Sequence, residues 1–304
     1  MQGMEHTHEV LENGRLRATV LPSCGGALLN LTLLGRAAHP VELLRAAPPA
    51  QGRVAPEDSA CFPLVPWSNR LSQGGFSTPT GRIRIEPNRP PEPYPIHGEG
   101  WLLPWRVMER AGPRIVLGLD RSQGGPYLYR ARLSYTLVGI TLRMELSVTH
   151  LDEAPMPYGL GLHPWLPFEE GMQVRAAASG MWQETGEHLP GAYGPVPSDV
   201  DFATFRAVPD RWTNNAFDGW DGRADFVWPR RQVSLALRCR GAPYFVLYHP
   251  PGETFICFEP VTHPVDAFHL PPPRRGEGLR WLRHGETLSL TCELAAADAG
   301  PTRA

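Results

Sequence analysis

The clearest pattern in this chain is an alternation of apolar and polar residues in its middle. Apolar side chains occupy the even positions from Ile140 to Val148, and Thr, Arg, Glu or Ser occupies each odd position between them. A period of two is typical of a strand with one buried side and one solvent-facing side. The segment from Tyr129 to Leu137 is similar, and Val138-Gly139 between the two predicts a hairpin turn.

Further segments predict short strands that are separated by turns. Asn13-Gly14 between two apolar segments is a strong hairpin signal, and Ala111-Gly112 separates a similar pair. The other predicted strands are two within residues 9–21, then 27–33, 82–86, 105–109, 114–119, 224–228, 233–238, 244–249, 254–259 and 287–294. Residues 45–60, 61–76 and 164–223 are rich in proline and glycine, and we expect loops there.

These patterns favour a fold without long helices. No convincing amphipathic helix is present, and the 34 prolines and 31 glycines fit the many turns of an all-β protein. Many short strands at turn spacing are typical of sandwiches. We therefore expect an all-β fold, a large antiparallel β-sandwich, in which residues 1–304 form a single domain.

The composition indicates a globular protein with a sizeable core. Of the 304 residues, 42% are hydrophobic and 20% are charged, which is too apolar for a disordered chain. The formal net charge is −2 and no basic block occurs, so nothing indicates binding to nucleic acid. The chain has no lysine, which excludes a Schiff-base lysine, a pyridoxal phosphate anchor and a Walker-type phosphate loop.

The cysteines and the N-terminal segment bear on the compartment. Five cysteines are scattered without a C-x-x-C pair, and we expect reduced, mostly buried thiols at Cys24, Cys61, Cys239, Cys257 and Cys292. The first ten residues lack an apolar signal core, and no stretch approaches the ~18 apolar residues of a membrane span. We therefore expect a cytoplasmic protein that does not associate with membranes.

His163 is the first candidate for chemistry. It follows a glycine-rich segment and precedes Pro164, so it should lie extended at the end of a strand. Its ordinary pKa of roughly 6.5 suits a general acid or base. A structural role in an aromatic turn is the alternative.

Glu259 is the second candidate. It ends an apolar run and precedes Pro260, which should stop strand pairing and leave the carboxylate at the strand exit. Partial desolvation there would raise its pKa toward the range of a general base. A rim carboxylate paired with an arginine is the alternative. Asn69-Arg70 and His97 lie in predicted loops, where Arg70 could equally be a structural clamp.

Four segments together resemble one family, the aldose 1-epimerases or galactose mutarotase-like proteins. They are PLVPWSNRLSQGGF (63 to 76), IHGEGW (96 to 101), GLGLHPW (159 to 165) and CFEPVTHPVDAF (257 to 268), in the order and rough spacing of that family. FDGWDGRADFVWP (217 to 229) is similar to a bacterial subgroup of mutarotase-like proteins. The resemblance covers about residues 9–294 and implies the β-supersandwich of this family.

The resemblance also implies roles for individual residues. Glu259 corresponds to the general base of the family and His163 to its general acid. His97 and Arg70 correspond to ligands of the sugar hydroxyls, and Asn69, in the same motif as Arg70, is a further candidate ligand.

One position departs from the family pattern. The family has a sugar-binding aspartate three residues before an aromatic residue, whereas here Asn214 precedes Phe217 by that spacing. Asp218 is close in sequence and could substitute for it. Because charge assistance strengthens hydrogen bonds, we expect Asn214→Asp to improve sugar binding. Trp165 is a candidate to stack on the sugar, with core packing as the alternative.

The implied activity is that of an aldose 1-epimerase, or mutarotase, which interconverts the α and β anomers of a free hexose without a cofactor. No metal is expected, because neither the histidines nor the cysteines have metal-ligand spacing. The expected partner is a monosaccharide, and the expected assembly is a monomer or homodimer.

Three other functions remain open. A hexose-6-phosphate mutarotase would need arginines at a phosphate, for which Arg82, Arg84 and Arg89 are available. A glycoside hydrolase would need a second carboxylate across the scissile bond. A non-catalytic carbohydrate-binding protein would need the cleft without the base.

Overall fold

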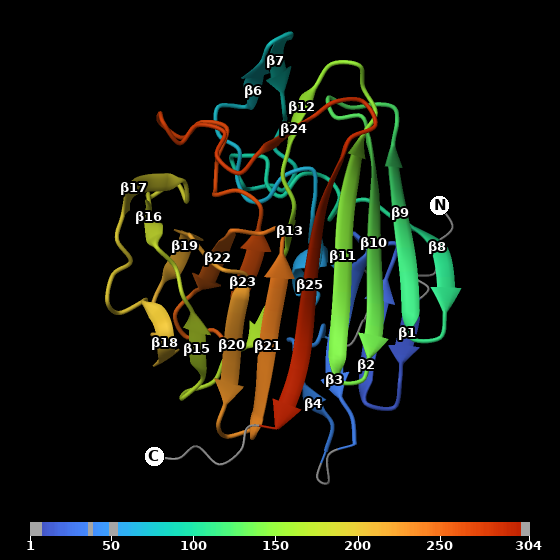
Figure 1. Ribbon diagram of the computed structural model, residues 1–304, viewed down its shortest axis with the longest axis vertical. Helices are drawn as coiled ribbons and strands as arrows, with labels where there is room; N and C mark the ends of the chain where they lie inside the picture. Colours follow the sequence, from blue (N-terminus) through green and yellow to red (C-terminus); the bar gives the residue numbers. More distant parts are fainter. Residues whose placement is uncertain (1–7, 36–38, 49–53, 299–304) are drawn as a thin grey trace.

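Antiparallel sheets make up almost all of the computed structural model, which describes residues 8–35, 39–48 and 54–298 (Figure 1). The nine-stranded sheet has the order β18 (Phe202–Ala207), β15 (Gln173–Ala176), β20 (Arg223–Trp228), β21 (Val233–Arg240), β25 (Thr287–Asp298), β11 (Thr141–His150), β10 (Tyr129–Val138), β9 (Arg114–Arg121) and β8 (Arg106–Ala111). The eight-stranded sheet has the order β17 (Pro190–Gly194), β16 (Gly180–Glu184), β19 (Thr213–Asp218), β22 (Tyr244–His249), β23 (Phe255–Val261), β13 (Gly161–Leu162) and β5 (Pro63–Leu64), with β14 (Trp165–Pro167) paired to β23.

The remaining strands form a smaller sheet and two hairpins. The four-stranded sheet consists of β1 (Glu9–Glu12), β2 (Leu16–Leu21), β3 (Ala27–Leu33) and β4 (Val41–Glu42). The hairpins pair β6 (Gly75–Thr78) with β7 (Gly81–Arg84), and β12 (Met156–Tyr158) with β24 (Arg280–Leu282). In the described ranges the only helical turn is a 3-10 turn at Pro56–Asp58. None of the helical structure described is long and apolar enough to cross a membrane.

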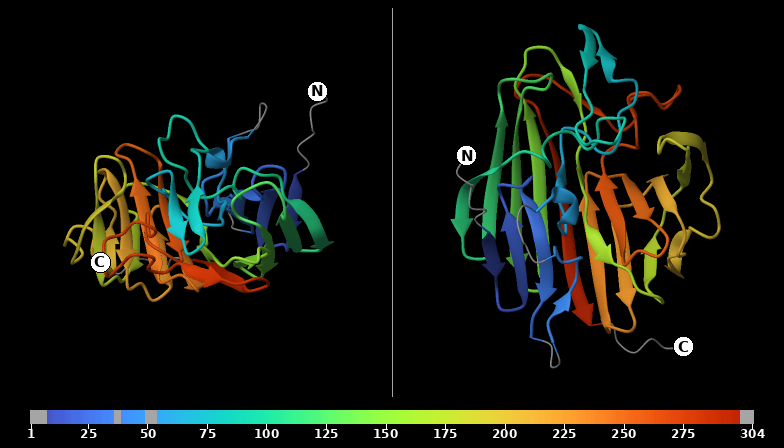
Figure 2. Two further views of the ribbon diagram at one scale, coloured as in Figure 1. Left: turned by 90° about the horizontal axis from the view of Figure 1, so that it is seen from above. Right: turned by 180° about the vertical axis from the view of Figure 1, so that it is seen from behind.

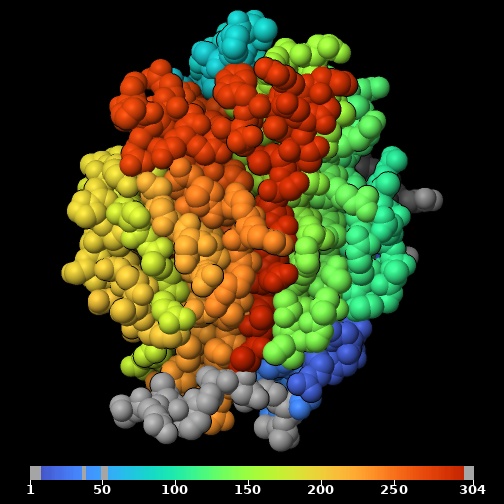
Figure 3. All heavy atoms as spheres, viewed as in Figure 1, coloured from blue at the N-terminus to red at the C-terminus, as the bar shows by residue number. Residues whose placement is uncertain are grey.

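The sheets form the two layers of a sandwich, which confirms the predicted all-β architecture. The nine-stranded sheet is one layer, and the four- and eight-stranded sheets lie next to each other against it (Figures 1 and 2). One buried cluster joins all three sheets and includes Leu16, Leu133 and Phe245. On the outer face of the large sheet, β25 runs as a red band between the orange and green strands (Figure 3). The single-domain organisation stays a prediction.

Alternation along β23 decides which of its side chains face the core and which face away from it. Ile256 and Phe258 belong to the core cluster, where the ring of Phe258 stacks on that of Phe245 at 4.4 Å. Cys257 belongs to a smaller cluster on the opposite face. Glu259 lies two residues further along the strand and therefore shares the face of Cys257.

The strand predictions are confirmed over most of the chain. The predicted central hairpin is β10 and β11, whose register runs from Tyr129 opposite His150 to Val138 opposite Thr141. The predicted loop over 164–223 is wrong, because β14 to β19 lie there. These strands have only three to six residues each and are separated by proline- and glycine-rich turns, so none shows a long alternation.

The expectation that Pro260 ends strand pairing is also wrong. β23 continues to Val261, and Glu259 pairs with Val246 of β22. On its other side β23 changes partner, because β14 pairs with it up to Cys257 and β13 pairs with it at Val261. A proline has no N–H to donate, and it is tolerated here because it lies between these two partners.

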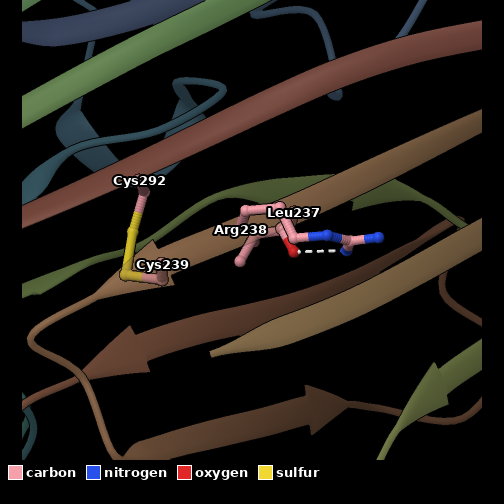
Figure 4. Close-up of a disulfide and its surroundings, with 4 residues drawn as sticks. All are labelled: Leu237, Arg238, Cys239 and Cys292. Atoms are coloured by element: carbon pink, nitrogen blue, oxygen red, sulfur yellow. Dashed lines mark hydrogen bonds between the residues drawn. A yellow bond between two sulfur atoms is a disulfide. The ribbon is translucent and has the colours of Figure 1, made fainter. Parts of the chain in front are cut away.

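Two of the cysteines form a disulfide instead of free thiols. Cys239 of β21 and Cys292 of β25 lie opposite each other on neighbouring strands and are bonded (Figure 4). The prediction of reduced thiols is therefore wrong for this pair, whose members are 53 residues apart and are brought together only by the register of the sheet. Cys61 and Cys257 are buried free thiols, as predicted.

Candidate active site

A cavity of about 240 Å³ opens on the face of the eight-stranded sheet that carries Glu259. Its lining consists of Glu57, Phe62, Asn69, Arg70, Arg89, Glu92, Ile96, His97, Trp101, His163, Trp165, His188, Trp212, Asn214, Tyr248 and Glu259. Every site residue predicted from the sequence is in this set except Asp218. The folded chain therefore brings together predicted residues from five separate segments of the sequence.

Glu259 and His163 meet on the floor of this cavity. The Oε1 atom of Glu259 lies 3.2 Å from Nε2 of His163, and the two side chains are 3% and 8% exposed. Neither Glu259 Oε2 nor His163 Nδ1 has a hydrogen-bond partner among the described residues. Buried polar atoms are usually paired in folded proteins, so these two atoms are exceptions whose hydrogen-bonding capacity is unused.

His163 is held in place by a stack of four side chains. Its position follows from the gap between β13 and β14, where its N–H donates to the Phe62 carbonyl. The imidazole lies between the rings of Phe62 and Trp165, at centroid distances of 4.5 and 5.1 Å. The guanidinium of Arg45 covers Trp165, 3.7 Å from its ring. This stack fixes the plane of the imidazole relative to Glu259.

Burial sets the protonation of the pair. It raises the pKa of Glu259 to about 8, although the charge of Arg70 acts in the opposite direction. Burial, together with the charge of Arg45, lowers the pKa of His163 to about 3. Between these pH values the pair shares one titratable proton, which rests on Glu259 and can pass to Nε2 of His163, 3.2 Å from Oε1. The transfer converts two neutral groups into a carboxylate base and an imidazolium acid.

His97 is presented by a strained loop. Both Asn69 and His97 have positive φ angles, of 55° and 61°, which are uncommon for residues other than glycine and cluster at functional sites. The two residues bond reciprocally, because His97 N–H donates to the Asn69 carbonyl and Asn69 N–H donates to His97 Nδ1. Burial holds the pKa of His97 well below its ordinary value. A neutral His97 that accepts at Nδ1 carries its proton on Nε2 and is a fixed donor.

Asn88 holds the same loop from behind, and the sequence analysis missed it. Its side-chain amide donates to the carbonyls of Ile96 and Gly98, and its Oδ1 accepts from Ile96 N–H. These three bonds fix the residues on both sides of His97. Asn88 lies in a proline-dense segment with no motif of its own, so only the folded structure identifies it.

Two ion pairs line the cavity wall. Arg70 binds Glu92 with both Nε and Nη2, at 2.9 and 2.8 Å, which supports the clamp interpretation while keeping the guanidinium in the cavity lining. Arg89 binds Glu57 at 3.0 Å. Each arginine of the lining therefore already has a carboxylate partner.

Asn214 is held by a carboxylate that the sequence analysis missed. Its amide donates to Glu184 Oε1, and the same carboxylate accepts from His188 Nδ1 and Trp212 Nε1. This carboxylate lies next to Asn214 without lining the cavity, so an aspartate at position 214 would face it directly. The effect of Asn214→Asp on sugar binding stays a prediction, but this contact predicts a cost in stability.

Asp218 lies outside the cavity lining. It accepts from Tyr193 at 2.9 Å and from Arg274 at 3.2 Å. Asn214 and Asp218 are on the same face of β19 but four residues apart, which is roughly 13 Å along a strand. The suggestion that Asp218 replaces the family aspartate is therefore not supported. The described residues contain no group of ligands suitable for a metal ion.

The fold and the site define the class of the protein, which is that of the galactose mutarotase-like β-sandwiches. The sequence profile described as Aldose 1-epimerase matches residues 8–295. The chain belongs to the aldose 1-epimerase family. Family membership supports a general mutarotase or epimerase role.

Individual relatives agree with this assignment. The chain is 32% identical over 247 residues to the uncharacterized protein YphB of Escherichia coli K12, covering 78% of this chain and 83% of that protein. The crystal structure of a putative aldose 1-epimerase from Escherichia coli K12 superimposes with a TM-score of 0.87 at 29% identity, covering 96% and 99% of the two chains. A galactose mutarotase-like protein from Clostridium acetobutylicum shares the fold, with a TM-score of 0.82 at 20% identity and coverages of 97% and 96%.

Glu259→Gln should stabilise the folded protein at neutral pH. The pKa of Glu259 is raised from 4.5 to about 8, so the wild type loses stability as pH rises between these values, whereas the variant does not. We expect the variant to be more stable by roughly 2 to 3 kcal/mol at about pH 7 and nearly equal at about pH 4. Urea unfolding at both pH values measures this, and a pH-independent difference would contradict a protonated Glu259.

Asn214→Asp should destabilise the protein by roughly 1 to 2 kcal/mol, because two carboxylates would meet at hydrogen-bond distance. Adding Glu184→Gln supplies a new donor to Asp at 214 and should restore at least half of the loss. Urea unfolding of the wild type, both single variants and the double variant measures the coupling. Additive effects of the two substitutions would show that these side chains do not interact.

Proposed function

We propose that this protein is an aldose 1-epimerase that interconverts the α and β anomers of a free hexose. The observation that carries the proposal is the isolated pair of Glu259 and His163, 3.2 Å apart on the cavity floor. Anomer exchange needs one base at the anomeric hydroxyl and one acid at the ring oxygen. This pair supplies both with a single proton.

The reaction then proceeds in two steps, ring opening and ring closure. Glu259 takes the proton of the anomeric hydroxyl while the O–H electron pair forms the C1 carbonyl. The C1–O5 bond breaks, and O5 takes a proton from the His163 imidazolium. Rotation about C1–C2 presents the other face of the aldehyde, and the reverse proton transfers close the ring. Each proton transfer typically contributes roughly 10² to 10⁴ in rate, and no cofactor takes part in these steps.

The other predicted residues serve as ligands of the sugar in this proposal. His97 donates from Nε2, because its Nδ1 already accepts from Asn69. The side-chain amide nitrogen of Asn69 and the Nη1 atom of Arg70 are further donors, since their other polar atoms are engaged within the loop. Asn214 offers Oδ1, and Trp165 offers a ring already fixed by Arg45.

Three competing functions have less support. A sugar phosphate needs unpaired arginines, whereas Arg70 and Arg89 are bound to carboxylates, and Arg82 and Arg84 do not line the cavity. A glycoside hydrolase needs two catalytic carboxyls, and the other carboxylates of the lining are held in those ion pairs. A non-catalytic binding protein does not require a buried carboxyl that contacts only an imidazole, which is the arrangement of Glu259 and His163. The cytoplasmic location and the monomeric or homodimeric state stay predictions.

Glu259→Gln should lower the rate of mutarotation by roughly 10² or more while sugar binding survives, because the amide keeps the shape but cannot accept the proton. Polarimetry with freshly dissolved α-D-glucose and α-D-galactose measures the rate, and calorimetry measures binding. Asp218→Asn is the matched control, since Asp218 lies outside the cavity lining. A Glu259→Gln variant with wild-type rates would refute the assignment of the base.

His163→Asn and His97→Asn should affect different kinetic parameters. An acid acts mainly in the transition state, so His163→Asn should lower kcat by roughly 10² with little change in KM. A ligand binds ground and transition states alike, so His97→Asn should raise KM as well. Steady-state polarimetry of both variants separates the roles, and equal kinetic profiles would refute the division.

A further inference from the structure

The loop of residues 68–72 carries two of the proposed sugar ligands, Asn69 and Arg70. The chain before it is β5, whose pairing with β13 attaches it to the eight-stranded sheet. The chain after it enters the hairpin of β6 and β7, which projects above both layers of the sandwich (Figures 1 and 2). The loop is therefore attached to a layer by strand pairing at one end only.

Two side chains that follow β23 bind the two ends of this loop. At the first end, the N–H of Ser68 donates to Nε2 of His263 over 3.1 Å. At the second end, Ser72 donates twice to Asp266, from its N–H to Oδ1 at 3.0 Å and from its Oγ to Oδ2 at 2.6 Å. The strand that carries Glu259 thus leads directly into both anchors of the loop.

His263 is a fixed acceptor. It is 1% exposed, and burial lowers the pKa of its imidazole to about 4, so the ring is neutral at neutral pH. Its Nδ1 lies 2.8 Å from the carbonyl of Pro264, which can only accept, so Nδ1 carries the proton and Nε2 accepts from Ser68. A Cβ atom at position 159 would collide with this ring, so Gly159 leaves the space that the anchor needs.

Asp266 makes more hydrogen bonds than the first anchor. Besides the two bonds from Ser72, its carboxylate accepts from Nδ1 of His269 at 2.7 Å, and these three bonds engage both of its oxygens. Asp266 is 5% exposed and has a positive φ of 48°. This conformation is uncommon for residues other than glycine and clusters at functional sites.

The two anchors act on the cavity through the backbone of the loop. Asn69 and Arg70 lie between them, and Asn69 is bonded reciprocally to His97. A shift of the loop therefore moves these three proposed ligands together. Glu259 and His163 are held separately, by the strands beside β23 and by the aromatic stack.

We propose that Asp266 is a positioning residue of the candidate active site, and that its bonds to Ser72 hold Asn69 and Arg70 in place for the sugar. This inference rests on the proposed function, which assigns those two ligands. Asp266 is outside the cavity lining, so it acts without touching the sugar. Its loss should weaken sugar binding and leave the acid–base pair intact.

The test compares substitutions at Asp266 with one at a distant carboxylate. Polarimetry with α-D-glucose and α-D-galactose gives kcat and KM for the wild type and each variant. We expect Asp266→Ala to raise KM about tenfold and to change kcat less than about threefold, because the ligands are displaced and the acid–base pair is not. Asp266→Asn should raise KM only about threefold, since the amide keeps an oxygen for the N–H of Ser72 and can donate to its Oγ.

Asp225→Ala is the matched control. Asp225 of the nine-stranded sheet accepts from Arg175 and Arg238 and is outside the cavity lining. Its substitution should lower the midpoint of urea unfolding, as Asp266→Ala does, and leave KM unchanged. Equal increases in KM for Asp225→Ala and Asp266→Ala would overturn the inference, because KM would then follow stability alone.

A double-mutant cycle with Asn69→Ala shows whether Asp266 acts through the loop. In the Asn69→Ala background, Asp266→Ala should raise KM less than about threefold. Multiplicative effects of the two substitutions on KM would overturn the inference. If Asp266→Ala does not fold, Asp266→Asn carries the same cycle, and its smaller increase in KM should likewise shrink in that background.

Calorimetric titration with D-glucose and D-galactose separates this inference from the proposed function. Weaker binding by folded Asp266→Ala supports the inference, even if no sugar is interconverted and the proposed function fails. Mutarotation with the wild-type KM in folded Asp266→Ala or Asp266→Asn overturns the inference and leaves the proposed function intact. A wild type that neither interconverts nor binds either sugar overturns both.

Discussion

The constraint on which this site depends is the burial of one carboxyl whose Oε2 atom has no hydrogen-bond partner among the described residues. An ionised carboxylate in such a place costs several kcal/mol, so Glu259 keeps its proton and its pKa rises to about 8. Within the described residues, the group in contact with this carboxyl that can take the proton is His163, whose own pKa burial lowers to about 3. Transfer of the proton forms the carboxylate of Glu259 and the imidazolium of His163 together. Each ion then has its counter-ion 3.2 Å away.

The rest of the fold keeps these two groups in register. Glu259 lies on β23, which has paired strands on both sides, and the opposite face of that strand is fixed by Phe258 in a stack with Phe245. His163 comes from the gap between two short strands and is fixed by ring stacking instead of by a ladder. Of the surrounding side chains, Asn214 and Trp165 also come from strands of this sheet, whereas Asn69, Arg70 and His97 come from loops.

The sequence was informative wherever one local pattern was sufficient. Alternation identified β10 and β11, and a polar residue next to a proline identified both His163 and Glu259. The sequence was uninformative where a contact depends on the register between neighbouring strands. The strands between 164 and 223 are too short to show a period, and Cys239 meets Cys292 only across neighbouring strands. Arg45 and Glu184 act through Trp165 and Asn214, so no motif reveals them.

The asparagine at position 214 shows how such long-range contacts change the meaning of a motif. Read along the chain, Asn214 is a family aspartate that has lost its charge. In the folded protein, Glu184 of β16 accepts a hydrogen bond from this amide. A negative charge is therefore still present next to position 214, on the neighbouring strand and outside the cavity lining. An amide is then the better residue at position 214, because it donates to Glu184 and still offers an oxygen to the cavity. The asparagine that departs from the motif and the carboxylate that the sequence did not reveal are therefore joined by one hydrogen bond.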